Sequence, residues 1–111
     1  MVLTARIERW SKLDLDKVTE MISRKIVSGR HQMLVQVYLK CGAQIPLHTH
    51  ASEQIVYVLQ GKLQCLVGDR FLTVREGEVI YIPSGVSHQI EAIEDTFQLA
   101  VFSPIREEWL S

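Results

Sequence analysis

Short runs of β-branched and aromatic residues, separated by glycine and proline, make up the chain from Met21 onward. Such runs are typical of short β-strands joined by tight turns, and no stretch shows the apolar periodicity of a long amphipathic helix. Gly61, Gly68 and Gly77 fall between successive runs, where tight turns favour a residue that tolerates positive φ. The predicted strands cover residues 21–28, 32–40, 54–60, 62–67, 71–75, 78–82, 87–92 and 96–102. This pattern predicts an all-β sandwich or barrel rather than an α/β fold.

Two of the predicted strands are apolar on both faces. Residues 55–59 and 79–82 are apolar at consecutive positions, whereas a strand with one face in water alternates apolar and polar residues. One face fills the barrel, and we expect the other to pack on a second copy, because a chain of 111 residues leaves much of its surface uncovered. We therefore expect one domain over residues 1–111 that forms a homodimer. Residues 1–20 are expected to form an N-terminal extension, with at most one helical turn, that packs on the barrel or on the dimer partner.

Composition narrows the classes of protein further. Hydrophobic residues make up 47% of the chain and charged residues 23%, and 12 Lys+Arg against 13 Asp+Glu give a net charge of -1. These values exclude a disordered chain and a polybasic nucleic-acid surface. No apolar run approaches the roughly 20 residues that cross a bilayer, and Cys41 and Cys65 lack the spacing of a disulfide scaffold. We expect a cytoplasmic protein with a small-molecule ligand and no nucleic-acid or membrane partner.

Three of the four histidines carry the candidate chemistry. His48 and His50 are two residues apart, so on an extended strand both imidazoles project from one face and can bind one ion. Gln54 has the same parity, whereas the adjacent Glu53 has the opposite parity. His88 enters from a strand far away in the sequence. If the three histidines and Gln54 meet, they form a pocket with three imidazoles and one amide.

The spacing around these residues resembles the two motifs of the cupin family. Residues 42–61 read Gly-x5-His-x-His-x3-Gln-x6-Gly, with Gln where the first motif usually has Glu. Residues 77–92 read Gly-x5-Pro-x-Gly-x2-His, and Ala92 stands where the second motif usually ends in Asn. The chain therefore resembles a small single-domain cupin of the conserved-barrel, RmlC-like type. The resemblance implies a double-stranded β-helix, which is a jelly-roll barrel.

Three segments look more specifically like the small pectin-degradation cupins: residues 48–61, 81–88 and 101–110. Those proteins linearise 4,5-unsaturated monouronates into keto-deoxyuronates, and Gln rather than Glu is their metal ligand. The resemblance implies that one divalent transition metal is held by His48, His50, Gln54 and His88. Such imidazole-rich donors suit Zn, Ni, Fe, Mn, Co or Cu. Because the donors are neutral, they leave the charge of the ion uncompensated, which favours an anionic ligand.

The resemblance also assigns residues around the sugar. It places Phe102 beside the sugar and Arg106 on the sugar's carboxylate. The family's acidic residue two positions before that Phe, proposed to handle the proton, is Ala100 here. Gln98 shares a face with Ala100 and Phe102, so Gln98 and Phe102 are the catalytic candidates of this strand.

Gln36 and Tyr38 interrupt an apolar strand and share one of its faces. They are interpreted either as a solvent-facing edge or as part of the pocket lining. On the second interpretation they are candidate substrate-binding residues together with Phe102 and Arg106.

The function predicted from these residues is that of a metal-binding cupin. The first hypothesis is a lyase- or isomerase-type enzyme that acts on a small sugar acid or carbonyl compound by Lewis-acid catalysis. An iron-dependent dioxygenase is the second, because the same type of pocket supports oxygen chemistry. The third is a non-catalytic module that binds a small ligand, and the loss of the acid at Ala100 favours it.

Overall fold

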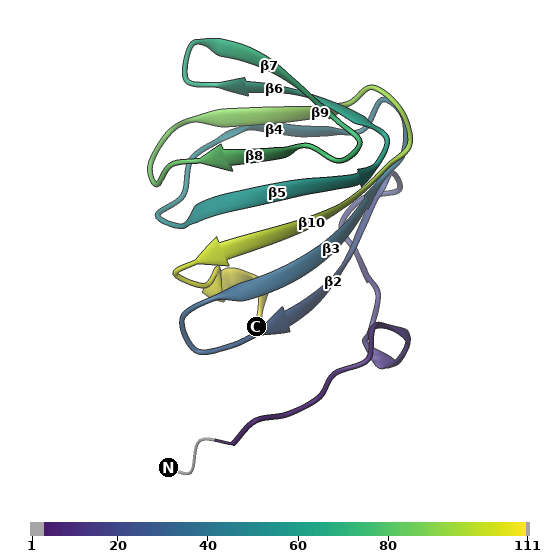
Figure 1. Cartoon of the computed structure of the whole chain (residues 1–111), viewed down its shortest axis with the longest axis vertical. Helices are drawn as coiled ribbons and strands as arrows, with labels where there is room; N and C mark the ends of the chain where they lie inside the picture. Colours follow the sequence, from purple (N-terminus) through teal and green to yellow (C-terminus); the bar gives the residue numbers. More distant parts are fainter. Residues whose placement is uncertain (1–3, 111) are drawn as a thin grey trace.

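Two antiparallel β-sheets face each other across a hydrophobic core in the computed structural model, which describes residues 4–110 (Figure 1). The six-stranded sheet contains, in spatial order, β1 (Asp16–Lys17), β2 (Ile22–Ser28), β3 (Met33–Leu39), β10 (Thr96–Ser103), β5 (Glu53–Gln60) and β8 (Val79–Ile82). The four-stranded sheet contains, in spatial order, β4 (Gln44–His48), β9 (His88–Ala92), β6 (Lys62–Val67) and β7 (Arg70–Arg75). Two short 3-10 helices lie near the ends of the chain, η1 (Trp10–Lys12) and η2 (Glu107–Trp109). The predicted all-β jelly roll, a double-stranded β-helix, is confirmed.

All eight predicted strands form, with bounds that agree within a residue, but the sequence pattern missed β1 and β4. Pro46 lies inside β4 and argues against a strand, because proline cannot donate a ladder hydrogen bond. The strand forms nevertheless because β4 is at the edge of its sheet, and its register against β9 shifts between Ile45 and His48. Edge strands and register shifts are the places where a sheet accepts proline.

Strict alternation of buried and exposed side chains defines the inner face of the large sheet. On β3, Met33, Val35, Val37 and Leu39 are buried, and the residues between them are not. Strand β10 lies beside β3 with Ala100 opposite Val35, so its own buried positions continue the same inner face. The inner face of β10 therefore supplies both core residues and the wall of the pocket described below.

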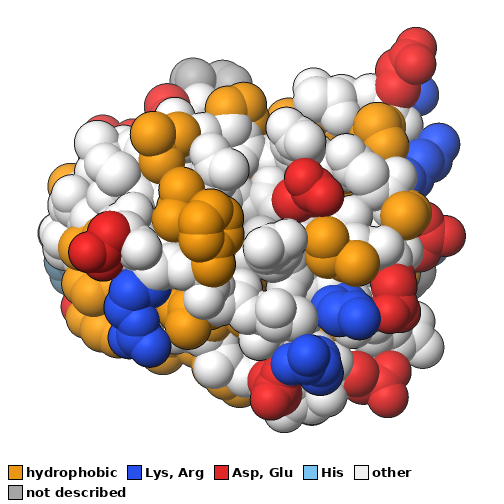
Figure 2. Space-filling view, turned by 90° about the horizontal axis from the view of Figure 1, so that it is seen from above, with side chains coloured by type: hydrophobic (Ala, Val, Ile, Leu, Met, Phe, Trp, Pro, Cys, Tyr) orange, Lys and Arg blue, Asp and Glu red, His pale blue; other side chains and the backbone are white. Residues whose placement is uncertain are grey.

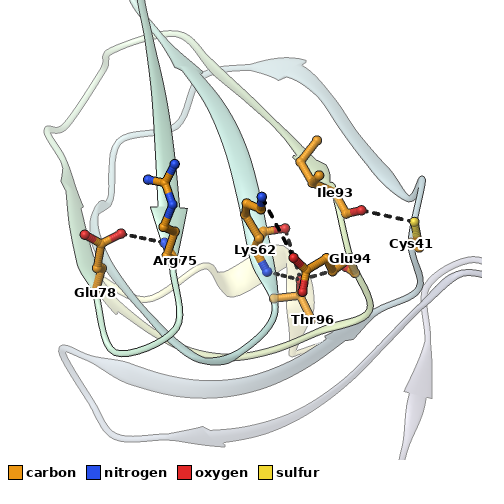
Figure 3. Close-up of polar contacts among 7 residues, drawn as sticks. All are labelled: Cys41, Lys62, Arg75, Glu78, Ile93, Glu94 and Thr96. Carbon is orange, nitrogen blue, oxygen red and sulfur yellow. Dashed lines mark hydrogen bonds and ion pairs between the residues drawn. The ribbon is translucent and has the colours of Figure 1, made fainter.

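Polar and backbone contacts close the end of the barrel opposite the histidines (Figure 3). There the Thr96 hydroxyl lies 3.2 Å from the Lys62 amide nitrogen, and the Cys41 thiol donates to the Ile93 carbonyl at 3.2 Å. Gly61 has a φ of +99°, and a Cβ there would collide with the backbone of Thr96. Only glycine satisfies both conditions, so the final glycine of the first motif is explained by packing at this end.

The N-terminal segment contacts the barrel at a few points and otherwise runs away from it (Figure 1). Lys25 donates through Nζ to the Trp10 carbonyl at 2.7 Å, and Asp16 on β1 pairs in register with Arg24 on β2. Ile7 is 91% exposed, so the described part of the extension does not bury this apolar residue on its own barrel. Its predicted packing on a dimer partner stays a prediction.

The surface seen in Figure 2 carries hydrophobic side chains next to both basic and acidic ones. Acidic and basic groups lie side by side on this face, as expected of a chain with a net charge of -1. Among the described residues no helix has the length and apolar character needed to span a membrane.

Candidate metal centre and its pocket

Three histidines from separate parts of the chain converge at one end of the barrel. His48 is the last residue of β4, His88 is the first residue of β9, and the two are register partners in the small sheet. His50 lies in the loop after β4 rather than on the strand itself. One ring nitrogen from each histidine lies within 4.8 Å of those of the other two. The predicted convergence of the three imidazoles is thus seen in the structure, although strand parity does not place His50.

Each imidazole is oriented by a backbone carbonyl close by in the chain. The Nδ1 atoms of His48, His50 and His88 lie 2.8, 2.8 and 2.9 Å from the carbonyl oxygens of residues 46, 52 and 86 respectively. Because a carbonyl oxygen only accepts, each Nδ1 carries the proton, and each Nε2 presents a lone pair. This arrangement is the one that prepares histidines as metal ligands.

Two of the Nε2 atoms have an environment that a cation would satisfy. His88 Nε2 is buried and has no hydrogen-bond partner among the described residues. His50 Nε2 lies 2.9 Å from Gln54 Oε1, so that two acceptors face each other. Reversal of the Gln54 amide would satisfy His50 alone, whereas one divalent ion would satisfy His50, His88 and Gln54 together. The donor set therefore fits a metal ion.

Gln54 is well placed to complete this set. It is buried on β5, whereas its neighbour Glu53 is exposed and accepts a hydrogen bond from the Tyr81 hydroxyl at 3.3 Å on the outer face. The carboxylate thus points away from the histidines, as the parity of the strand predicts.

Burial keeps two of the ligand imidazoles, those of His50 and His88, neutral. Desolvation is the largest effect on His50 and His88, and it lowers the pKa of both below the ordinary value of 6.5. The positive charge of Arg106 lowers both pKa values further, while hydrogen bonds to the carbonyls of Ser52 and Val86 oppose the shift. Neutral imidazoles at pH 7 are available to bind a metal without first losing a proton.

A cavity of about 420 Å³ opens beside the histidines, and it is lined by the residues of β10 that the sequence predicts to lie at the site. Gln98, Ala100 and Phe102 all face inward and are 2%, 1% and 4% exposed. Gln98 Oε1 is buried with no hydrogen-bond partner among the described residues. An unpaired buried amide oxygen is costly, so a ligand with a hydroxyl or N–H group would find a ready acceptor here.

Two aromatic rings, Phe102 and Trp109, line the cavity beside the histidines. The Phe102 ring meets His50 edge to face at a centroid distance of 5.8 Å, and meets Trp109 in the same way at 5.1 Å. The guanidinium carbon of Arg106 lies 4.3 Å from the centroid of Trp109, and Arg106 donates through Nε to Glu108 at 2.8 Å. Arg106 also lines the cavity, and its guanidinium carbon lies 5.8 Å from the centroid of the Phe102 ring, so a cation shares the cavity with the histidines.

The prediction that Gln36 and Tyr38 line this pocket is wrong. Both lie on the outer face of β3, because the alternate residues of that strand fill the core. Tyr38 stacks on Phe97 at a centroid distance of 4.4 Å and borders a separate surface cavity of about 480 Å³ that contains none of the histidines. Of the two interpretations given by the sequence, the solvent-facing one is correct.

The structure adds Arg24 to the pocket, a residue that the sequence analysis did not single out. It lies on β2 two residues from Ile22 and two from Ile26, both of which pack in or against the core. On a strand, residues two apart point to the same face, so Arg24 shares the inward face of Ile22 and Ile26. A charged residue on an otherwise apolar face could have been recognised from the sequence as a candidate pocket residue.

Comparisons with known proteins agree with this geometry. Residues 35–103 match the cupin domain family. An uncharacterised protein of Methanocaldococcus jannaschii is 33% identical over 90 residues, covering 79% of this chain and 71% of that protein. Oxalate decarboxylase OxdC of Bacillus subtilis is 31% identical over 81 residues, covering 68% of this chain and 21% of that protein.

Two solved structures extend the likeness to nearly the whole chain. The structure of KdgF from Halomonas sp. has a TM-score of 0.88 at 28% identity and covers 96% of this chain and 99% of that chain. An RmlC-like cupin from Shewanella frigidimarina has a TM-score of 0.88 at 20% identity, with 96% of each chain covered. The resemblance stated from the sequence motifs is confirmed.

Proposed function

Because this chain belongs to the cupin family, we propose that it is a metal-dependent enzyme that acts on a small sugar acid or related carbonyl compound. The observation that carries the proposal is the set of neutral donors described above, in which Nε2 lone pairs and the Gln54 oxygen converge beside a cavity. The resemblance of residues 48–61, 81–88 and 101–110 to the pectin-degradation cupins, together with the likeness of the fold to that of KdgF, supports the choice of a sugar acid.

His48, His50, Gln54 and His88 would hold one divalent ion from the series Zn, Ni, Fe, Mn, Co and Cu. Oxalate decarboxylase of Bacillus subtilis, a protein of similar fold, has Mn(II) centres, and this supports manganese as one of the candidate ions. When bound, the ion would act as a Lewis acid toward a carbonyl or hydroxyl oxygen.

The other pocket residues have roles set by their chemistry. Arg106 would bind the carboxylate of the ligand, because its guanidinium presents planar, paired donors that match a carboxylate. Phe102 would pack against the apolar face of the sugar. The unpaired Gln98 Oε1 would accept a hydrogen bond from a ligand hydroxyl. Together these residues orient a small anion with its oxygens toward the histidines.

A specific observation favours a second candidate, a non-catalytic cupin that binds the same class of ligand. No carboxylate is found among the described residues that line the cavity, and the inward position on β10 that would hold one carries Ala100. Histidines that bind metal cannot also transfer protons, and an amide such as Gln98 takes up no proton near pH 7. The pocket therefore has binding groups but lacks an obvious proton-transfer group.

One experiment separates these proposals. Protein purified without metal-affinity resin is analysed for bound metals, reconstituted with each candidate ion, and assayed for linearisation of unsaturated galacturonate. Metal at one ion per chain with turnover supports the enzyme, and metal with ligand binding but no turnover supports the binding module. Protein that takes up no ion after reconstitution contradicts both.

A further inference from the structure

Arg24 projects from the inner face of β2 into the same cavity as the candidate metal centre. The register partner of Arg24 on β3 is Val37, which is buried, and the side chain of Arg24 is only 16% exposed. A cation at an inward position of a sheet loses hydration, and a buried apolar residue would fill the same place at lower cost. The position therefore calls for a reason beyond packing.

Arg24 and Arg106 meet at one indole ring. Their guanidinium carbons lie 4.1 and 4.3 Å from the centroid of the Trp109 ring. The two cations are thus separated by no more than the sum of these distances, although like charges repel. Each guanidinium is attracted to the Trp109 ring by a cation–π interaction, and this attraction offsets the repulsion between the two cations. Two positive charges nevertheless remain at one wall of the cavity.

The polar edges of both guanidinium groups are only partly used. Arg24 donates through Nε to Asp16 at 2.7 Å, and Arg106 donates through Nε to Glu108 at 2.8 Å. Asp16 and Glu108 have side chains 48% and 59% exposed, and such solvent-facing ion pairs contribute little to stability. No hydrogen bond in the described part of the chain uses an Nη atom of either arginine, so both retain free donors.

We propose that Arg24 is a second anion-binding residue and that the pocket takes small ligands with two anionic groups, such as dicarboxylates. The proposal deepens the proposed function, on which it rests, because it adds a second contact to the anion that Arg106 would bind. The cavity lining contains two arginines and no described acidic residue, and their partners Asp16 and Glu108 are half-exposed carboxylates outside that lining, so one carboxylate in the cavity leaves the second guanidinium without an anion on the cavity side. A second carboxylate balances that charge and uses the free Nη donors.

Matched pairs of ligands test this assignment. Malonate, succinate and glutarate are titrated by calorimetry against propionate, butyrate and valerate, which have the same chain lengths and one carboxylate fewer. We expect wild-type protein to bind the best dicarboxylate about tenfold more tightly than its matched monocarboxylate, the effect of one charge-assisted hydrogen-bonded pair. Arg24→Gln should remove this preference, because it weakens the dicarboxylate about tenfold more than the monocarboxylate.

Two further variants separate binding from folding. Asp16→Asn removes the ion pair on β1 and leaves the cation in place, so its preference for dicarboxylates should equal that of wild type. Arg106→Gln should weaken both members of each pair. Melting temperatures measured without ligand show whether Arg24→Gln is folded, and Arg24→Lys provides a second variant that keeps the charge and loses the paired donors. In Arg24→Lys we expect an intermediate preference.

Each titration is done on metal-loaded and on metal-free protein. A wild type without preference for dicarboxylates, or an Arg24→Gln variant that keeps the full preference, overturns the assignment of Arg24. Because the arginines do not depend on the ion, a preference that persists in protein unable to take up metal supports Arg24 while contradicting the proposed function. Binding of neither ligand class by folded, metal-loaded protein overturns the anion site itself.

Discussion

His50 Nε2 and Gln54 Oε1 face each other at 2.9 Å, although the Nδ1–H of His50 already donates a hydrogen bond to the Ser52 carbonyl. Two acceptors at this distance repel unless a cation or a proton lies between them. The contact therefore links a residue of the loop after β4 to a residue of β5 through the ion that both would bind.

Gln54→Leu should lower the affinity for the metal at least about tenfold, because it removes one ligand and leaves a side chain of similar size. The measurement is a competition titration with a chelator of known affinity. Glu53→Gln is the matched control: it lies one residue away on the outer face of β5 and should leave the affinity unchanged. Equal affinities of Gln54→Leu and wild type would exclude the amide from the ligand set.

Acid should destabilise the metal-free protein through the same histidines. Burial lowers the pKa of His50 and His88 in the folded chain, whereas in the unfolded chain both have ordinary values near 6.5. Below pH 6.5 the unfolded chain thus binds more protons, and the free energy of unfolding falls until the pH passes the lowered folded pKa values. Above pH 6.5 the stabilisation is fully present.

Melting temperatures of metal-free protein, measured from about pH 7.5 to about pH 4.5 so that the range spans the ordinary histidine pKa of about 6.5, give this dependence. His88→Gln should flatten the decrease, because the variant lacks one of the two shifted groups. His31→Gln is the control, because His31 is exposed and outside the cavity, and it should keep the wild-type profile. A His88→Gln profile identical to that of wild type would show that protonation of His88 is not coupled to unfolding.

The eight predicted strands follow from local information. Alternation of apolar residues and the placement of turn glycines are properties of a few neighbouring positions, and the same alternation already separated Glu53 from Gln54. Strand β4 escaped prediction because Pro46 is unfavourable in a strand by itself, and only its place at the edge of the sheet makes it acceptable.

The pocket required long-range information. The three histidines were found because their spacing matches a known motif, but the motif does not say that His50 lies in a loop. Arg24 and Trp109 are 85 residues apart in the sequence. They meet because β2 packs beside β3 and because the chain returns to this end of the sheet after β10. Alternation alone could place Arg24 inward, yet it could not identify the indole that it meets.

The outer face of the large sheet predicts a homodimer. Ile55 is 44% exposed and has Tyr81 and Val101, both also exposed, as its register partners on either side. Exposed apolar side chains that adjoin across three strands are typical of a protein interface, and a two-fold dimer would bury this face against the same face of a second copy.

Ile55→Asp should therefore weaken the dimer at least about tenfold, because a charge at the centre of an apolar interface loses hydration without gaining a partner. Light scattering over a dilution series measures the change. Phe71→Asp is the control: Phe71 is 67% exposed on β7 of the other sheet and should leave the dimer intact. A wild type that is monomeric at micromolar concentration would contradict the prediction.

Ala100 decides whether the pocket is an efficient catalyst for uronate linearisation. It is 1% exposed between Val35 and Val56, its register partners, and its side chain faces the cavity. A positioned carboxylate that transfers a proton contributes about 10²–10⁴-fold to a rate. The proposed enzyme should accordingly turn over unsaturated galacturonate only slowly, whereas the alternative binding module should not turn it over at all.

Ala100→Asp should increase that activity, because it places a carboxylate on the inner face of β10, two residues from Phe102 and within the field of Arg106 and the bound ion. The nearby positive charge offsets the cost of burying the new carboxylate, so the variant should fold when loaded with metal. Ala100→Asn is the matched control, since it has nearly the same volume and cannot transfer a proton near pH 7. Initial rates of wild type and both variants, measured at equal metal content, give the comparison. A gain in Ala100→Asp alone assigns the missing proton transfer to position 100, whereas a wild-type rate near about 10 s⁻¹, usual for an enzyme, would mean that another group already supplies it.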